Sequence, residues 1–190
     1  MKPVRMKRKT IGLWMSVATL LAPALVKAQT VAITPSYTTV GVNGTVQYSE
    51  GVDVGYRWYN AQKVTPLFPF GYGLSYTNFS YSHLQMQSSG HGATATVTIT
   101  NTGRTTGAEV AQLYLTDPAA AGEPPYQLKG FQKVTLAPGH SQRITLQLTS
   151  QDLSYYRTAT SSWVVAPGLY RVSIGSNERD LWVSGSFFAS

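Results

Sequence analysis

Apolar residues alternate with hydroxyl residues in several short runs of the chain. Residues 93–101 read Ala-Thr-Ala-Thr-Val-Thr-Ile-Thr-Asn, a period of two that turns every second side chain to one face. The same alternation returns at 144–148 and at 170–174. These runs predict strands that each bury one face.

Residues that favour turns separate the runs. Asn101-Thr102-Gly103, Ala137-Pro138-Gly139-His140 and Pro167-Gly168 all contain glycine, two of them with proline, which suits tight turns. About seven short strands spaced by turns predict an all-β, immunoglobulin-like β-sandwich. No stretch after residue 28 shows sustained helical periodicity. The further strands are expected at residues 79–86, 108–116, 128–136, 162–165 and 180–188.

The strand at 108–116 has the least regular pattern. Its core candidates are Val110, Leu113 and Leu115. The phase shifts near Ala111 and Gln112, which indicates a bulge. A loop rich in Pro, Gly and Ala follows at 117–125, and because it cannot hold ladder hydrogen bonds we expect a change of sheet there.

The first 28 residues have the layout of a signal peptide. Five of the first nine residues are Lys or Arg with no acidic residue, and an apolar run follows at 11–25, before Val26-Lys27-Ala28. The run holds about 15 residues, whereas a membrane-spanning helix needs about 20, so a retained anchor is the weaker interpretation. A buried N-terminal helix is weaker too. Cleavage after Ala28 predicts a secreted or periplasmic chain that has no membrane contact afterwards.

The high formal charge of the chain belongs to this leader. It holds six of the fifteen Lys and Arg residues, which leaves nine against eight acidic residues, a net charge of +1. The remaining cations are scattered, so a nucleic-acid surface is not supported. The chain has no cysteine, and its three histidines lack metal-ligand spacing, so we expect neither a metal site nor a cofactor.

Residues 66–77, Pro-Leu-Phe-Pro-Phe-Gly-Tyr-Gly-Leu-Ser-Tyr-Thr, resemble the segment that enters the C-terminal domain of family 3 glycoside hydrolases, the β-glucosidase and β-xylosidase type. Residues 48–59 resemble the stretch before it. Downstream, the family's fibronectin type III-like domain is matched at 101–103, 109–114, 128–131 and 136–139.

The resemblance implies three parts of the chain. The leader, residues 1–28, precedes a linker-like segment, residues 29–76, which resembles the end of the family's middle domain. Residues 77–190 form the fibronectin type III-like domain. In the family, residues like those of 29–76 pack between the middle domain and the sandwich. We therefore expect part of residues 29–59 to be loosely ordered, to cover the sandwich, or to form an association surface.

The resemblance supplies no catalytic residue. In the family, the nucleophilic Asp lies in an N-terminal barrel domain, typically within a Ser-Asp-Trp string that is absent here, and the acid/base Glu belongs to the middle domain. Glu50 does not inherit that role. Glu50 and Asp53 lie in an open segment, and Glu178 and Asp180 flank a turn where we expect them to be solvated, so neither pair is expected to hydrolyse a glycoside.

Aromatic residues are the candidates for carbohydrate or partner contact, because Tyr and Trp rings stack on sugar faces. The alternative is that they fill the core or face another domain. The candidates are Tyr56, Trp58, Tyr59, Tyr126, Tyr155, Tyr156 and Trp163.

The sequence therefore leaves several functions open. The leading one is an exported, non-catalytic accessory or remnant domain of a family 3 glycoside hydrolase, whose partner is a polysaccharide or a glycosidase catalytic domain. The alternative is part of a β-glucosidase-type hydrolase, active only with a separate catalytic subunit. A gene fragment without a selected role is a third possibility. Fold resemblance alone does not carry activity across.

Overall fold

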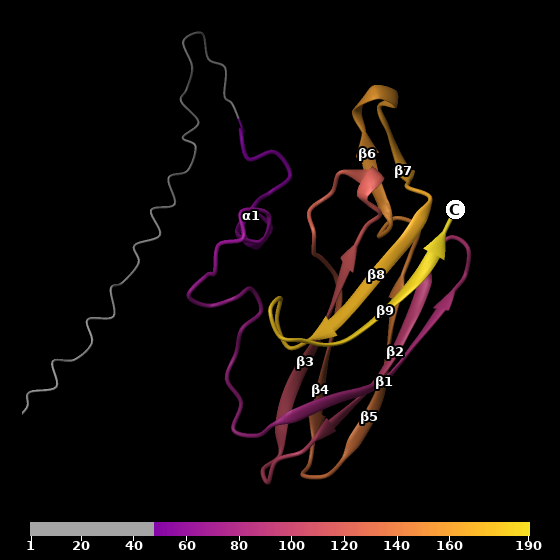
Figure 1. Ribbon diagram of the computed structural model, residues 1–190. Coiled ribbons are helices and arrows are strands. Elements are labelled where there is room, and N and C mark those ends of the chain that lie inside the picture. Colours follow the sequence, from indigo (N-terminus) through magenta and orange to yellow (C-terminus); the bar gives the residue numbers. More distant parts are fainter. Residues whose placement is uncertain (1–47) are drawn as a thin grey trace, which may run out of the picture. The chain divides into compact units, whose positions relative to one another are not determined.

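Two antiparallel sheets pack face to face in the computed structural model, which describes residues 48–190 (Figure 1). The predicted leader and residues 29–47 lie outside the described residues. One sheet has the order β1-β2-β5, formed by β1 (Phe79–Ser88), β2 (Ala93–Asn101) and β5 (Ser141–Leu148). The other has the order β4-β3-β8-β9, formed by β3 (Gly107–Thr116), β4 (Gln127–Leu136), β8 (Gly168–Gly175) and β9 (Leu181–Ala189).

These seven strands confirm the predicted sandwich. The strand expected at residues 162–165 is also present, in a hairpin whose other strand was not expected. A hairpin of β6 (Ser154–Arg157) and β7 (Ser162–Val165) forms a small sheet of its own and projects beyond the larger sheets in Figure 1. The 3₁₀ turns η1 (Ala119–Ala121) and η2 (Thr158–Thr160) lie in the β3–β4 loop and at the hairpin tip. One short helix, α1 (Tyr56–Ala61), precedes the strands.

The core lies between the two larger sheets. Every second residue of β2, from Ala93 to Ile99, is buried, as the alternation predicts, and the opposite sheet contributes Leu113, Leu115 and Ile174. Phe187 stacks on Tyr170 with ring centroids 5.4 Å apart. Replacing a buried leucine such as Leu113 by alanine removes about 2–5 kcal/mol from the free energy of unfolding.

Two details of the predicted strand at 108–116 were wrong. Val110 is exposed rather than buried, because Ala111, Leu113 and Leu115 are the residues that face the core. The alternation through Ala111 and Gln112 is regular. The register shift lies further along, where Leu113 pairs with Gly130 while Tyr114 pairs with Leu128, so the extra residue belongs to β4.

The chain changes sheets at a different loop from the one predicted. The loop at 117–125 connects β3 to β4, which are neighbours in one sheet. The chain changes sheets between β2 and β3, and again at the tight turn of residues 137–140 between β4 and β5. Gly139 has a φ of 73° in this turn, and the His140 N–H donates to the Ala137 carbonyl at 3.1 Å.

Candidate functional site

The segment before β1 is anchored to the sandwich by the first residue of α1. The Tyr56 hydroxyl accepts a hydrogen bond from the Leu128 N–H at 2.9 Å, and its ring stacks on Phe70 at 4.7 Å and meets Tyr114 edge-on at 6.2 Å. A six-residue helix without a side-chain cap does not form stably alone. These contacts therefore hold α1 against the sandwich. Of the three outcomes expected for part of residues 29–59, this is the one in which the segment covers the sandwich.

A buried carboxylate in the β8–β9 loop forms the second anchor. Contrary to the solvated position predicted for it, Glu178 has a fully buried side chain. Its Oε2 accepts from Asn60 Nδ2 at 2.9 Å, and its Oε1 accepts from Arg179 Nε at 3.0 Å. The Glu178 N–H donates to the Phe70 carbonyl at 3.1 Å, and Arg179 also donates to the Val64 carbonyl at 3.1 Å. A buried charge needs such partners, so the carboxylate ties the segment to the sandwich.

A third anchor lies on the outer face of β3. Gln112 Nε2 donates to the Gly71 and Ser176 carbonyls at 3.3 and 2.5 Å, and Gln112 Oε1 accepts from the Tyr114 hydroxyl at 2.7 Å. Burial, with help from nearby Tyr56, raises the pKa of Tyr114 well above its usual range, so this hydroxyl stays a donor. The segment thus covers the outer face of β3, which explains why residues 111–115 are all buried.

The same segment leaves a row of apolar side chains uncovered by the described part of the chain. Tyr76, Leu74 and Leu67 are 100, 89 and 85% exposed. We call residues 67–76 the apolar segment; its exposed large apolar side chains are Leu67, Phe68, Phe70, Tyr72, Leu74 and Tyr76. Contiguous exposure of this kind marks interaction sites in soluble proteins, whereas single exposed residues do not.

A first hollow, of about 950 Å³, lies between the β6–β7 hairpin, the turn before it and α1. We call it the hairpin hollow. It brings together three of the predicted contact residues, Tyr155, Tyr156 and Trp163, and adds Arg57 of α1. The Trp163 and Tyr156 rings meet at 70° with centroids 5.6 Å apart, and Trp163 is 69% exposed.

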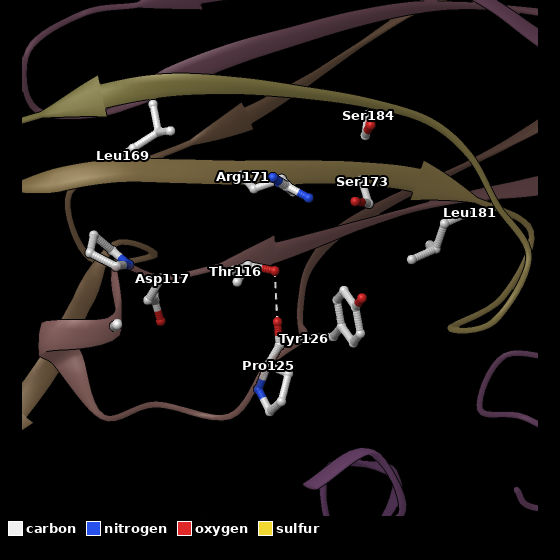
Figure 2. Close-up of a pocket in the computed structure, with 11 residues that line it drawn as sticks. Thr116, Asp117, Pro125, Tyr126, Leu169, Arg171, Ser173, Leu181 and Ser184 are labelled. Atoms are coloured by element: carbon white, nitrogen blue, oxygen red, sulfur yellow. Dashed lines mark hydrogen bonds between the residues drawn. The ribbon is translucent and has the colours of Figure 1, made fainter. Parts of the chain in front are cut away.

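A second hollow, of about 490 Å³, lies between the β3–β4 loop and the outer face of β8 and β9 (Figure 2). Tyr126, another predicted contact residue, lines it together with Arg171 and Asp117, and we call it the Asp117 hollow. Burial raises the pKa of Asp117 to about 6, with Lys129 opposing this shift and Glu123 adding to it. Asp117 Oδ2 accepts from Gln127, while its buried Oδ1 has no partner.

The remaining predicted contact residues lie apart from both hollows. Trp58 and Tyr59 are neighbours on α1, with their rings edge to face at 5.4 Å, and both are half-buried. Tyr56 serves as an anchor. Sequence reasoning missed Arg57, Asp117 and Glu178, because only the long-range packing places them beside their partners.

Residues 109–178 match the family model of the fibronectin type III-like domain. The chain is 39% identical to "Thermostable beta-glucosidase B" of Acetivibrio thermocellus in an alignment 153 residues long that covers 77% of this chain and 20% of the relative. It is also 39% identical to "Probable beta-glucosidase D" of Aspergillus niger, over 74% of this chain and 21% of the relative.

Solved structures give the same result. The β-D-glucoside glucohydrolase of Trichoderma reesei superposes with a TM-score of 0.76 at 38% identity, covering 80% of this chain and 24% of that one. The chain carries a fibronectin type III-like domain related to those of family 3 β-glucosidases. It spans about a fifth of the length of the curated relatives. Since the strands begin at residue 79, a match over 80% of the chain must include part of the segment before the fibronectin type III-like domain.

Most carboxylates around this fibronectin type III-like domain hold the fold together. Of the eight in the chain, six accept side-chain or backbone hydrogen bonds: Glu109, Asp117, Glu123, Asp152, Glu178 and Asp180. Asp117 and Glu123 come close, because both accept from Gln127 Nε2, at 2.9 and 3.2 Å. Asp117 lines one hollow and Glu123 the other, whereas glycoside hydrolysis uses two carboxyl groups on opposite sides of one cleft.

Residues 48–190 contain neither a cluster of metal ligands nor a helix that could span a membrane. No group of three or more potential ligand side chains lies close enough to hold a metal ion in this part of the chain. None of its helices has the length and apolar character needed to span a bilayer.

Proposed function

We propose that this chain is an exported, non-catalytic module that docks onto the catalytic part of a β-glucosidase-type glycoside hydrolase through its apolar segment. The main support for this proposal is that the two sides of residues 48–76 differ. One side is fixed to the fibronectin type III-like domain through Tyr56, Asn60 and Gly71. The other side exposes large apolar side chains.

A row of aromatic and aliphatic side chains on a fixed backbone is a suitable docking surface. Ordering a flexible segment opposes association, and here intramolecular hydrogen bonds have already ordered it. Full burial of one exposed leucine against a partner contributes about 1.5–3 kcal/mol. Leu67 and Leu74, which are nearly fully exposed, are therefore the expected main contributors.

The arrangement of the carboxylates favours a module without its own chemistry. Hydrolysis in the complex would then come from the partner, and this chain would position or stabilise it. β-Glucosidase activity thus belongs to the proposal only as activity of the assembled complex, consistent with the names of the relatives.

Docking can be tested with a catalytic part of known sequence. The β-glucosidase of Acetivibrio thermocellus, shortened by the part that this chain matches, is mixed with the purified chain, and complex formation is followed by light scattering after size-exclusion chromatography. We expect a one-to-one complex and an increase in hydrolysis of nitrophenyl β-glucoside relative to the shortened enzyme alone.

Variants locate the docking surface. Leu74→Asp should weaken the complex by about 1.5–3 kcal/mol, because it places a charge where apolar area is buried. Phe188→Asp is the matched control, since Phe188 is also exposed but lies on β9. Absence of a complex, or equal weakening by both variants, would contradict docking through the apolar segment.

A further inference from the structure

The hairpin hollow has features that the docking proposal does not use. Tyr156 and Trp163 are paired residues of β6 and β7, so their side chains lie on the same face of the hairpin. Tyr156 supports the edge of the Trp163 ring, and both rings remain open to solvent. An exposed tryptophan whose orientation is fixed by a neighbour presents a flat apolar surface at low conformational entropy.

The base of the hairpin is firmly attached to the core. Leu153 precedes β6, Ala166 follows β7, and both are buried. The Tyr170 hydroxyl donates to the Ala166 carbonyl at 2.8 Å and lies 3.3 Å from the Leu153 carbonyl. The two aromatic rings therefore belong to a hairpin whose base is fixed to the core.

The remaining lining of the hollow is polar and electrically balanced. Its charged residues are Arg57, Lys129, Glu123 and Asp152, two of each sign. The uncharged hydrogen-bonding side chains include Gln151 and Ser154. A balanced lining gives no preference for an anion or a cation, which favours a neutral ligand that carries many hydroxyl groups.

A neutral sugar chain matches this combination. A pyranose ring has an apolar face of C–H groups that stacks on an aromatic ring, and a rim of hydroxyl groups that donate and accept hydrogen bonds. We propose that the hairpin hollow binds a neutral polysaccharide, with Trp163 as the stacking platform and Tyr156 as its support. The volume of about 950 Å³ lies at the upper end for small-ligand sites, so it leaves room for more than one sugar unit.

The proposal is tested by native affinity electrophoresis of the purified chain in gels that contain soluble polysaccharides. The neutral probes are mixed-linkage β-glucan, xyloglucan and arabinoxylan, and polygalacturonate is the anionic probe. We expect retardation by at least one neutral probe, unchanged at raised salt because the ligand is uncharged, and none by polygalacturonate.

Two tryptophan variants assign the binding to the hollow. Trp163→Ala should weaken retardation about tenfold or more, whereas Trp182→Ala should behave as the parent chain. Trp182 is similarly exposed, but it lies on β9 and does not line the hollow. Because both side chains are exposed, we expect both variants to fold, which circular dichroism verifies.

Three results would overturn the proposal: no retardation by any neutral probe, retardation by polygalacturonate alone, or equal retardation of the parent chain and the Trp163→Ala variant. A protein that covers the hollow instead of a sugar would give the first of these. Trp163→Ala should leave the complex with the shortened β-glucosidase intact. The failure of sugar binding can therefore be distinguished from the failure of docking.

Discussion

Asn60 Nδ2 donates to Glu178 Oε2 at 2.9 Å and so joins a short helix to a loop 118 residues further along the chain. The carboxylate is fully buried, and its other oxygen pairs with Arg179. This bond is one of several contacts that hold the segment before β1 on the sandwich, together with those of Tyr56 and Gln112. A change at Asn60 should therefore alter the amide protection of this segment, which hydrogen exchange can measure.

Asn60→Asp should loosen the segment, although the contacts of Tyr56 and Gln112 remain. The new carboxylate would lie beside buried Glu178 without a donor between them, and like charges at this distance repel strongly. We expect residues 48–76 to lose amide protection in hydrogen exchange, while the strands keep theirs. Gln62→Ala is the matched control, since Gln62 is exposed just after the same helix. Unchanged protection in the Asn60 variant would show that this bond does not hold the segment.

Two glycines of the apolar segment should respond differently to alanine. Gly71 has a φ of 82°, and a Cβ there would meet the side-chain amide of Gln112. Gly71→Ala should therefore lower the free energy of unfolding by about 1–3 kcal/mol, from backbone strain and loss of the Gln112 bond. Gly73→Ala meets nothing within 4 Å and should be nearly neutral. Urea denaturation measures both variants, and equal effects would argue against the contact.

The ionisation of Asp117 should make the stability of the chain depend on pH. Burial raises its pKa to about 6 in the folded state, above its ordinary value of 3.8. The folded state therefore binds the proton more tightly, and stability falls as pH rises between about 4 and 6. The Asp117→Asn variant cannot ionise at this position. Its free energy of unfolding should therefore rise relative to that of the parent chain by about 1 kcal/mol as the pH increases from 4 to 6, a figure reduced for solvent screening.

Urea titrations at pH 4, 5, 6 and 7 provide this comparison. Asp152→Asn is the control, because Asp152 caps an exposed turn through its bonds to Thr149. A constant difference between the Asp117 variant and the parent chain at all four pH values would contradict a raised pKa in the folded state.

The alternation of apolar and hydroxyl residues predicted the strands well, since each strand's period is local. Residues 93–101 and 144–148 were placed correctly, with the expected residues buried. The assignment failed at β3, where Val110 is exposed and Gln112 is buried. There the outer face is covered by a segment that lies about 40 residues earlier in the chain. An alternating pattern indicates that one face of a strand is buried. It cannot indicate that a distant segment of the chain covers the other face.

The candidate site was predictable only in its residue types. Aromatic residues identified Tyr155, Tyr156 and Trp163 as contact candidates, and the β6–β7 hairpin brings them into one hollow. Glu178 lies near Asp180 at a turn, and this pattern suggested that both side chains are solvated. The neighbouring sequence contains no sign that the Glu178 carboxylate is buried. Its partner Asn60 lies on a helix of six residues, too short to show helical periodicity.

Hydrolysis of nitrophenyl β-glucoside by the purified chain alone is the most direct test of the central proposal, that this module has no chemistry of its own. We predict a rate equal to that of buffer across the range from pH 4 to pH 8. Measurable turnover that is lost in Glu123→Gln or Asp117→Asn, the two carboxylates that both accept from Gln127, would contradict it.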